Sequence, residues 1–193
     1  SRGLGDVYKR QIIMYTNGVK VRNFGDKMAK AVYPGTFDPF SNGHLDIVKR
    51  ASQIFDEVHI LVSCNIKKHP TFTAEERVNL IKMVVKDIPN VKVISSNALV
   101  VQYAKENEIK VIIRGLRNYQ DYESEFSLAQ FNKDIEPNIE TLLMMPSAKN
   151  QFISSSAIKE FVIYNIDISP YVPKEIVPYV TKKFKSNNTK TLL

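Results

Sequence analysis

Short apolar runs alternate with segments of helical period between residues 28 and 185. The runs predict strands over 29–34, 57–64, 91–94, 110–113 and 140–145. Helices are predicted over 43–55, 73–85, 99–106, 121–134, 154–164 and 173–184. Strands that are joined by helices pair in parallel, because a parallel connection needs a long crossover. We therefore predict an α/β fold with a doubly wound, five-stranded parallel sheet and helices on both of its faces.

The composition is that of a single globular domain. The chain has 193 residues, of which 44% are hydrophobic, and this suffices to bury a core. The single cysteine, Cys64, excludes an internal disulfide framework and a cysteine-rich zinc site. No apolar run approaches the ~18–20 residues that span a bilayer, and the start of the chain shows no secretory pattern. We therefore expect a cytoplasmic protein with no membrane partner.

The net charge of +7 is compatible with an RNA-binding module. However, six basic and two acidic side chains lie in residues 1–27, so this segment accounts for +4 of that charge. The rest of the chain shows no basic stripe interleaved with aromatic residues. The modest positive charge of the remaining chain suits the binding of anionic small molecules better than the binding of RNA. We therefore expect no nucleic-acid partner. Weak, salt-sensitive RNA binding would be the simple check of the alternative.

The pattern of the chain changes abruptly near Met28. Residues 1–27 lack a sustained apolar period, and Met28 has the character of a natural initiator. We interpret residues 1–27 as a non-native or disordered leader. Residues 186–193 are polar and are expected to form a flexible tail, which leaves residues 28–185 as the folded domain.

The loop after the first strand carries the clearest chemical signal. It runs Gly-Thr-Phe-Asp-Pro-Phe-Ser-Asn-Gly-His from Gly35 to His44. His44 falls in the first turn of the next helix, where free N–H groups favour phosphate. An imidazole there can donate a hydrogen bond to charge on a phosphoryl group, and Thr36 adds a hydroxyl. Taken alone, His44 could equally be a buried core histidine on the apolar face of this helix.

Two further loops follow strands and suit anions. Arg114 and Arg117 flank a Gly-Leu pair after the fourth strand, where two guanidinium groups can clamp an anion. Three serines, Ser154 to Ser156, precede the helix after the fifth strand and offer hydroxyl and backbone donors. In isolation the arginines could be solvated surface residues and the serines plain N-caps. Because carboxyl ends of parallel strands meet at one edge, we expect the three loops to converge.

These motifs resemble known ones. The run from Tyr33 to His44 resembles the T/HxGH signature of the nucleotidylyltransferase superfamily. The run from Arg114 to Glu125 resembles the IRGLR…DxxYE segment of the phosphopantetheine adenylyltransferase family, and 152–156 resembles its FISSS element. The resemblance extends from about residue 31 to about residue 184. It implies a Rossmann-like nucleotidylyltransferase domain over 28–185 that transfers the adenylyl group of ATP to 4′-phosphopantetheine, giving dephospho-coenzyme A and pyrophosphate.

The resemblance also implies roles for individual residues. Those at the reaction centre are His44, Thr36, Lys68 and Arg114. Those that bind ATP are Thr36, Phe37, His44, Gly115, Leu116, Arg117, Glu125, Asn150, Gln151, Phe152, Ile153, Ser154, Ser155 and Ser156. Those that bind 4′-phosphopantetheine are Thr36, Lys68, Leu99, Val100 and Arg114. His69 receives no role.

The same resemblance implies a homohexamer and feedback inhibition by coenzyme A. Mg²⁺ is expected with ATP, and since no carboxylate cluster suggests a dedicated protein cage, it would be held mainly by phosphates and water. The alternatives are a nicotinate-mononucleotide adenylyltransferase or a cytidylyltransferase. The first-loop motif does not exclude either, whereas the segment from Arg114 to Glu125 argues against both.

Overall fold

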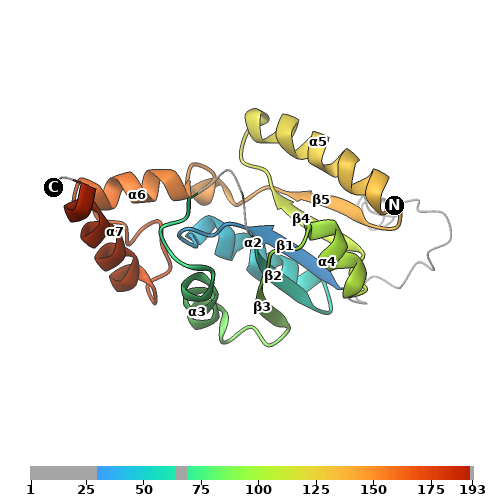
Figure 1. Cartoon of the computed structure of the whole chain (residues 1–193), viewed down its shortest axis with the longest axis horizontal. Helices are drawn as coiled ribbons and strands as arrows, with labels where there is room; N and C mark the ends of the chain where they lie inside the picture. Colours follow the sequence, from blue (N-terminus) through green and yellow to red (C-terminus); the bar gives the residue numbers. More distant parts are fainter. Residues whose placement is uncertain (1–29, 64–68, 192–193) are drawn as a thin grey trace, which may run out of the picture.

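A computed structural model describes residues 30–63 and 69–191 of the chain. It contains a parallel sheet of five strands in the order β3-β2-β1-β4-β5 (Figure 1). The strands are β1 (Ala31–Gly35), β2 (Val58–Ser63), β3 (Val91–Ser96), β4 (Val111–Gly115) and β5 (Glu140–Met144). The predicted doubly wound parallel sheet is therefore confirmed.

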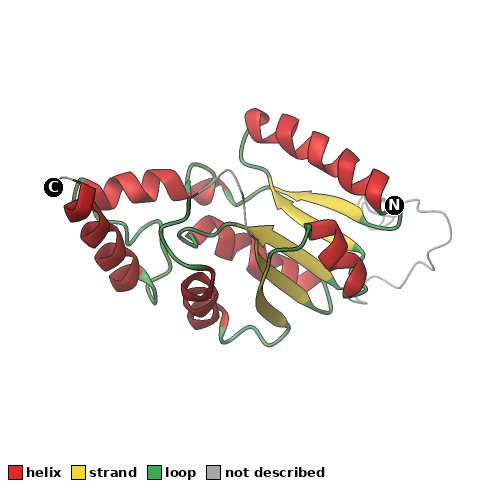
Figure 2. Cartoon of the chain, in the orientation of Figure 1, coloured by secondary structure: helices red, strands yellow, loops and turns green. Residues whose placement is uncertain are grey.

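Helices cover both faces of the sheet (Figure 2). They are α2 (Asn42–Ile54), α3 (Ala74–Val85), α4 (Val100–Glu106), α5 (Tyr119–Ile135), α6 (Ser155–Ile163) and α7 (Val177–Thr191), with a short 3₁₀ turn, η1 (Ala148–Asn150). The chain winds from β1 to β3 through α2 and α3, then crosses back to β4. Because such crossovers are right-handed, reversing the winding direction places α4 and α5 on the opposite face.

Side chains alternate along the central strand and divide the core in two. Ala31 and Tyr33 pack with residues of α2, α3, α6 and α7, whereas Val32 packs against the face that holds α4. The period of two along a strand produces this division. In Figure 1, α6 and α7 form a pair beyond the sheet, on the side toward which the carboxyl ends of the strands point.

The strand order reverses between β1 and β4, and their pairing stops early. The two strands pair only at Ala31 with Val111 and Val32 with Ile112, although they continue to Gly35 and Gly115. By contrast, β1 pairs with β2 along its whole length. Beyond the last β1–β4 pair the backbone is not bridged, so this edge offers a crevice at the topological switch point, where α/β sheets bind ligands.

The last helix differs from the prediction. We expected it over 173–184 with Pro173 in its first turn, but α7 begins at Val177 and runs to Thr191. Pro178 occupies its first turn, where the missing N–H is tolerated. Part of the predicted tail, residues 186–191, is helical, since no Gly or Pro follows Pro178 to end the helix. The predicted leader over 1–27 lies outside the described residues. Within 30–63 and 69–191, no helix is both long and apolar enough to cross a membrane.

Candidate active site

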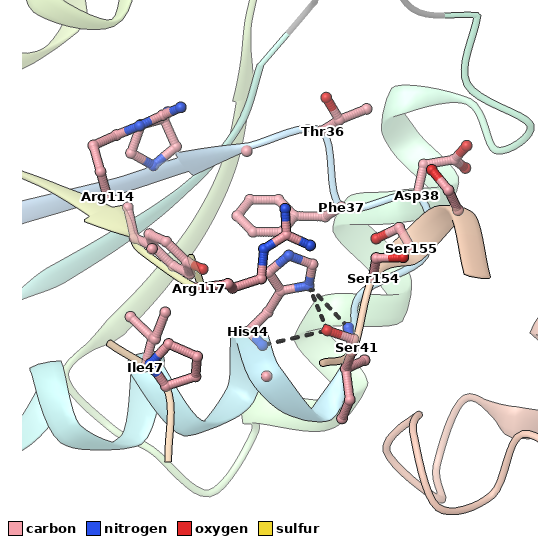
Figure 3. Close-up of a pocket in the computed structure, with 18 of the residues that line it drawn as sticks. Thr36, Phe37, Asp38, Ser41, His44, Ile47, Arg114, Arg117, Ser154 and Ser155 are labelled. Carbon is pink, nitrogen blue, oxygen red and sulfur yellow. Dashed lines mark hydrogen bonds between the residues drawn. The ribbon is translucent and has the colours of Figure 1, made fainter. Parts of the chain in front are cut away.

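A cavity of about 540 Å³ lies at the carboxyl edge of the sheet. Its wall is built from the ends of β1 and β4, the N-terminal turns of α2 and α6, and the loop before η1. The predicted loops therefore converge, and Figure 3 shows their side chains around one space. Three cationic side chains, Arg114, Arg117 and Lys159, face two carboxylates, Asp38 and Glu125, in this wall. Together with two helix N-termini, this arrangement favours a polyanionic ligand.

His44 is held by the capping box that starts α2. Ser41 is the N-cap, and its backbone N–H donates to Nδ1 of His44 at 3.0 Å. In return the His44 N–H donates to the Ser41 hydroxyl at 3.4 Å. Because a backbone N–H can only donate, Nδ1 must accept, and the neutral ring then carries its proton on Nε2. The helix start thus fixes both the ring orientation and the tautomer, and it makes Nε2–H the donor. Figure 3 shows the hydrogen bonds between Ser41 and His44.

Aromatic rings enclose the imidazole. Phe37 meets it edge-on with ring centroids 5.1 Å apart, and Phe40 lies at 5.5 Å. Phe37 has a positive φ of 52°, which is uncommon for a residue with a side chain. Its ring also covers Gly35, where an added Cβ would lie only 2.7 Å from two ring carbons. Gly35 therefore permits the close approach that places Phe37 against His44.

The two arginines from the end of β4 are already engaged. Arg114 makes a two-pronged ion pair with Glu125 of α5, at 2.5 Å and 2.8 Å. Arg117 makes a similar pair with Asp121, at 2.9 Å and 3.0 Å. Burial acts to raise the pKa of Asp121, but its bonds to Arg117 outweigh that effect and lower the pKa. Both carboxylates lie on the first turns of one helix and so aim both guanidinium groups.

The start of α6 contributes hydroxyl groups. Ser154 is the N-cap and accepts from the Ala157 N–H at 3.1 Å. Ser155 donates to the carbonyl of Pro39 at 2.9 Å, which joins this helix to the loop after β1. The plain capping role that we considered for Ser154 is therefore real. It coexists with the position of all three serines in the cavity wall.

Asp46 of α2 holds the loop that precedes α6. Its carboxylate accepts from both the N–H and the hydroxyl of Ser147, each at 2.9 Å. The Ser147 hydroxyl in turn accepts from Asn150 at 3.0 Å. Burial opposes ionisation of Asp46, yet the bonds from Ser147 and the charge of Arg50 outweigh it and lower the pKa. The backbone around η1 is thereby held against α2.

Comparison with known proteins agrees with this geometry. The family model described as cytidylyltransferase-like matches residues 32–161. The phosphopantetheine adenylyltransferase of Clostridium tetani is 51% identical over 158 residues, which are 82% of this chain and 98% of that protein. The phosphopantetheine adenylyltransferase of Clostridium kluyveri is 48% identical over 157 residues, 81% of this chain and 96% of that protein.

The chain belongs to the phosphopantetheine adenylyltransferase family. A solved structure from Vibrio parahaemolyticus, described as a candidate nicotinate-nucleotide adenylyltransferase, is also similar, with a TM-score of 0.55 at 20% identity. That match covers 82% of this chain and 93% of the other. At this identity the likeness concerns the fold alone.

Most of the residues predicted for this family site line the cavity. They are Thr36, Phe37, His44, Arg114, Gly115, Arg117, Glu125, Asn150, Ile153, Ser154, Ser155 and Ser156. Leu116, Gln151 and Phe152 belong to the same loops but are outside the lining, and Phe152 is 92% exposed. Leu99 and Val100, at the start of α4, are not brought into this cavity. Lys68 lies outside the described residues.

The structure adds residues that the sequence reasoning did not assign. Asp38 and Ser41, from the motif loop, line the cavity, as do His69 and Lys159. Ser41 could have been found, because Ser and His three positions apart at a helix start resemble a capping box with His in place of Glu or Gln. Lys159 gave no such signal, since a lysine within an amphipathic helix is usually a solvated surface residue.

Proposed function

We propose that this chain transfers the adenylyl group of ATP to 4′-phosphopantetheine, as its family does. The observation that carries the proposal is the convergence of Thr36, His44, two arginines and the α6 start around one cavity at the sheet's switch point. The acceptor is argued from the family, because the cavity's chemistry alone accounts for a nucleotide and a second phosphate.

In the proposed reaction, an oxygen of the acceptor phosphate attacks the α-phosphorus of ATP. A new O–P bond forms while the bond between the α-phosphorus and the bridging oxygen breaks, and pyrophosphate leaves with that electron pair. The acceptor phosphate is already anionic at neutral pH, so no protein base and no covalent intermediate are needed. Catalysis then depends on positioning and on stabilising charge.

The residues divide this work by position. His44 donates from Nε2–H to oxygen on the α-phosphate, and Thr36, directly after β1, adds a hydroxyl to the cavity wall. Arg114 holds the acceptor phosphate, while Arg117 and the Ser154–Ser156 turn hold the phosphates that leave. Arg114 and Arg117 arrive paired with Glu125 and Asp121, which keeps the guanidinium groups oriented before substrate binds.

Mg²⁺ is part of the proposal and fits the donors present. Of the cavity's two carboxylates, Asp38 is bonded to Lys159 and Glu125 to Arg114. A divalent ion that keeps phosphate and water ligands matches that arrangement better than a dedicated cage. When bound, such an ion would neutralise charge on the triphosphate.

The test is pyrophosphate release from ATP with 4′-phosphopantetheine as acceptor. Nicotinate mononucleotide and glycerol 3-phosphate serve as parallel acceptors, because they report the two alternative activities within the same fold. We expect turnover only with 4′-phosphopantetheine. Turnover with another acceptor alone would overturn the proposal.

We also propose that the protein assembles as a homohexamer in the cytoplasm and that coenzyme A inhibits it. Helix α5 supports self-association, because Tyr119, Phe131 and Ile135 are 83%, 65% and 59% exposed, and large exposed apolar side chains mark contact surfaces. Coenzyme A contains both the adenylyl and the pantetheine parts of the product, so it can compete for the same cavity. Sedimentation of the native chain and of Phe131→Glu tests the assembly. The feedback is tested by adding coenzyme A to the assay, where raising the concentration of 4′-phosphopantetheine should relieve the inhibition.

A further inference from the structure

Asp38 is a buried carboxylate in the cavity wall that the proposed chemistry does not use. It is 4% exposed. One oxygen accepts from the Phe72 N–H at 3.0 Å. The other accepts from the Thr71 N–H at 2.8 Å and from Lys159 Nζ at 2.5 Å. Because three donors occupy its oxygens, Asp38 is arranged to hold neighbouring segments rather than to take a proton or bind a metal.

The donors come from two segments that are far apart in sequence. Thr71 and Phe72 lead into α3, whereas Lys159 lies one turn after Ser155 on α6. Residues four apart share a helix face, and Ser155 donates to the carbonyl of Pro39, next to Asp38. Two adjacent contacts therefore attach the start of α6 to the loop that carries Thr36 and His44. Figure 3 shows Asp38 and Ser155 on the same side of the cavity.

We propose that Asp38 is a positioning residue. Acting through Lys159, it holds the N-terminal turn of α6 in place relative to Thr36 and His44. The inference rests on the proposed adenylyl transfer, in which the α-phosphate lies near His44 and the leaving phosphates lie at α6. In-line displacement requires those parts of ATP to stay aligned, and a shift of ~1 Å can lower the rate on the order of 10²-fold.

The chain provides a control in Lys183 of α7, which has the same kinds of partner as Lys159. Lys159 pairs with Asp38 and lies over the Phe184 ring at 5.7 Å, while Lys183 pairs with Glu76 and lies over the Phe72 ring at 5.5 Å. The two lysine side chains are 31% and 30% exposed. The Phe72 and Phe184 rings contact each other, with centroids 5.5 Å apart. The lysines thus share partners of the same kind, but the Asp38 side chain is 3% exposed and that of Glu76 41%, and only Lys159 lines the cavity.

The first experiment compares Lys159→Met with Lys183→Met in the full chain. Both changes remove an ion pair and a cation–π contact, but only Lys159→Met leaves a buried carboxylate without its cation, so we expect the larger drop in melting temperature in Lys159→Met. Both variants are therefore assayed well below their melting temperatures. We expect kcat/KM for ATP to fall roughly 10- to 100-fold in Lys159→Met alone, with KM for 4′-phosphopantetheine unchanged in both. Lys159→Arg, which keeps the charge beside Asp38, should recover most of the loss. Equal kinetic losses in the two methionine variants would overturn the inference.

A double-variant cycle separates positioning from direct catalysis. If Asp38 acts through Lys159, then Asp38→Asn combined with Lys159→Met should be no slower than the slower single variant. Losses that multiply would mean that Lys159 acts on the nucleotide itself, and would overturn the proposed role of Asp38.

The failure of this inference can be distinguished from failure of the proposed function. The unmodified chain is assayed first with 4′-phosphopantetheine. If it shows no turnover, the proposed function fails, and affinity for a non-hydrolysable ATP analogue is measured by calorimetry instead. Weaker binding by Lys159→Met than by Lys183→Met then supports the positioning of α6, whereas equal binding rejects it.

Discussion

Substitutions at His44 should separate folding from catalysis. The residue has two tasks on opposite sides of one ring: Nδ1 accepts from the Ser41 N–H in the capping box, while Nε2–H is the donor that we propose for the substrate. Glu and Gln are the usual residues at this capping position. His44→Glu and His44→Gln should therefore keep the cap, whereas His44→Ala removes its side-chain half.

The melting temperature and kcat should rank the His44 variants in different orders. In His44→Ala, losing half of the box costs about 0.5–1 kcal/mol, which lowers the melting temperature by roughly 1–4 °C for a domain of this size. Losing the donor lowers kcat on the order of 10²–10³-fold, or about 2.7–4 kcal/mol. His44→Glu keeps the cap but loses the ring contacts with Phe37 and Phe40, so it should melt between His44→Ala and the native chain. It should be slower than His44→Ala by roughly tenfold or more, because its charge repels phosphate. His44→Gln keeps an amide donor and should be intermediate.

Thermal melting and pyrophosphate release, measured on the same preparations, test this reasoning. We expect the native chain to be the most stable, His44→Glu and His44→Gln to follow, and His44→Ala to be the least stable. The value of kcat should fall in the order native chain, His44→Gln, His44→Ala, His44→Glu. A near-normal kcat for His44→Ala would refute the central role of this residue. A kcat that simply follows the melting temperature would refute the separation of the two tasks.

Three further outcomes are expected. Replacing Arg114 with Gln should raise KM for 4′-phosphopantetheine more than KM for ATP in steady-state assays, and the opposite result would reverse the assignment of the two substrates. Gly35→Ala should lower the free energy of unfolding by about 1–3 kcal/mol in urea titrations, since its Cβ would lie 2.7 Å from the Phe37 ring; an unchanged midpoint would show that the ring can move away. The lowered pKa values of Asp46 and Glu76 mean that their stabilising effect is complete above the unfolded pKa, about 4, and is lost as pH falls through the folded value. The urea concentration at the unfolding midpoint should therefore decrease as the pH is lowered below about 4, and it should decrease less steeply in Asp46→Asn. Parallel plots of midpoint against pH for the two chains would contradict this.

Local patterns were enough to predict the succession of strands and helices. Alternating apolar strands and helical stripes report burial directly, so the sheet, the helices on both faces and the helix predicted over 73–85 are confirmed. The end of the chain was harder, because helix limits depend on breakers and contacts: Pro178, not Pro173, opens α7. Motif residues such as Thr36, Arg114 and Ser154 were also predictable, because strand ends in a parallel sheet meet at one edge.

The sequence by itself therefore determined the fold class, the family and most of the loops that form the cavity. It also placed His44 in the first turn of a helix, since a Ser-Asn-Gly-His run before an apolar stripe is a local signal. Only the tertiary structure decided that Glu125 orients Arg114, that Asp46 holds the loop before η1, and that Asp38 joins α6 to the loop after β1. The last of these links residues 121 positions apart. Such contacts depend on how elements pack in space, and no spacing along the chain encodes them.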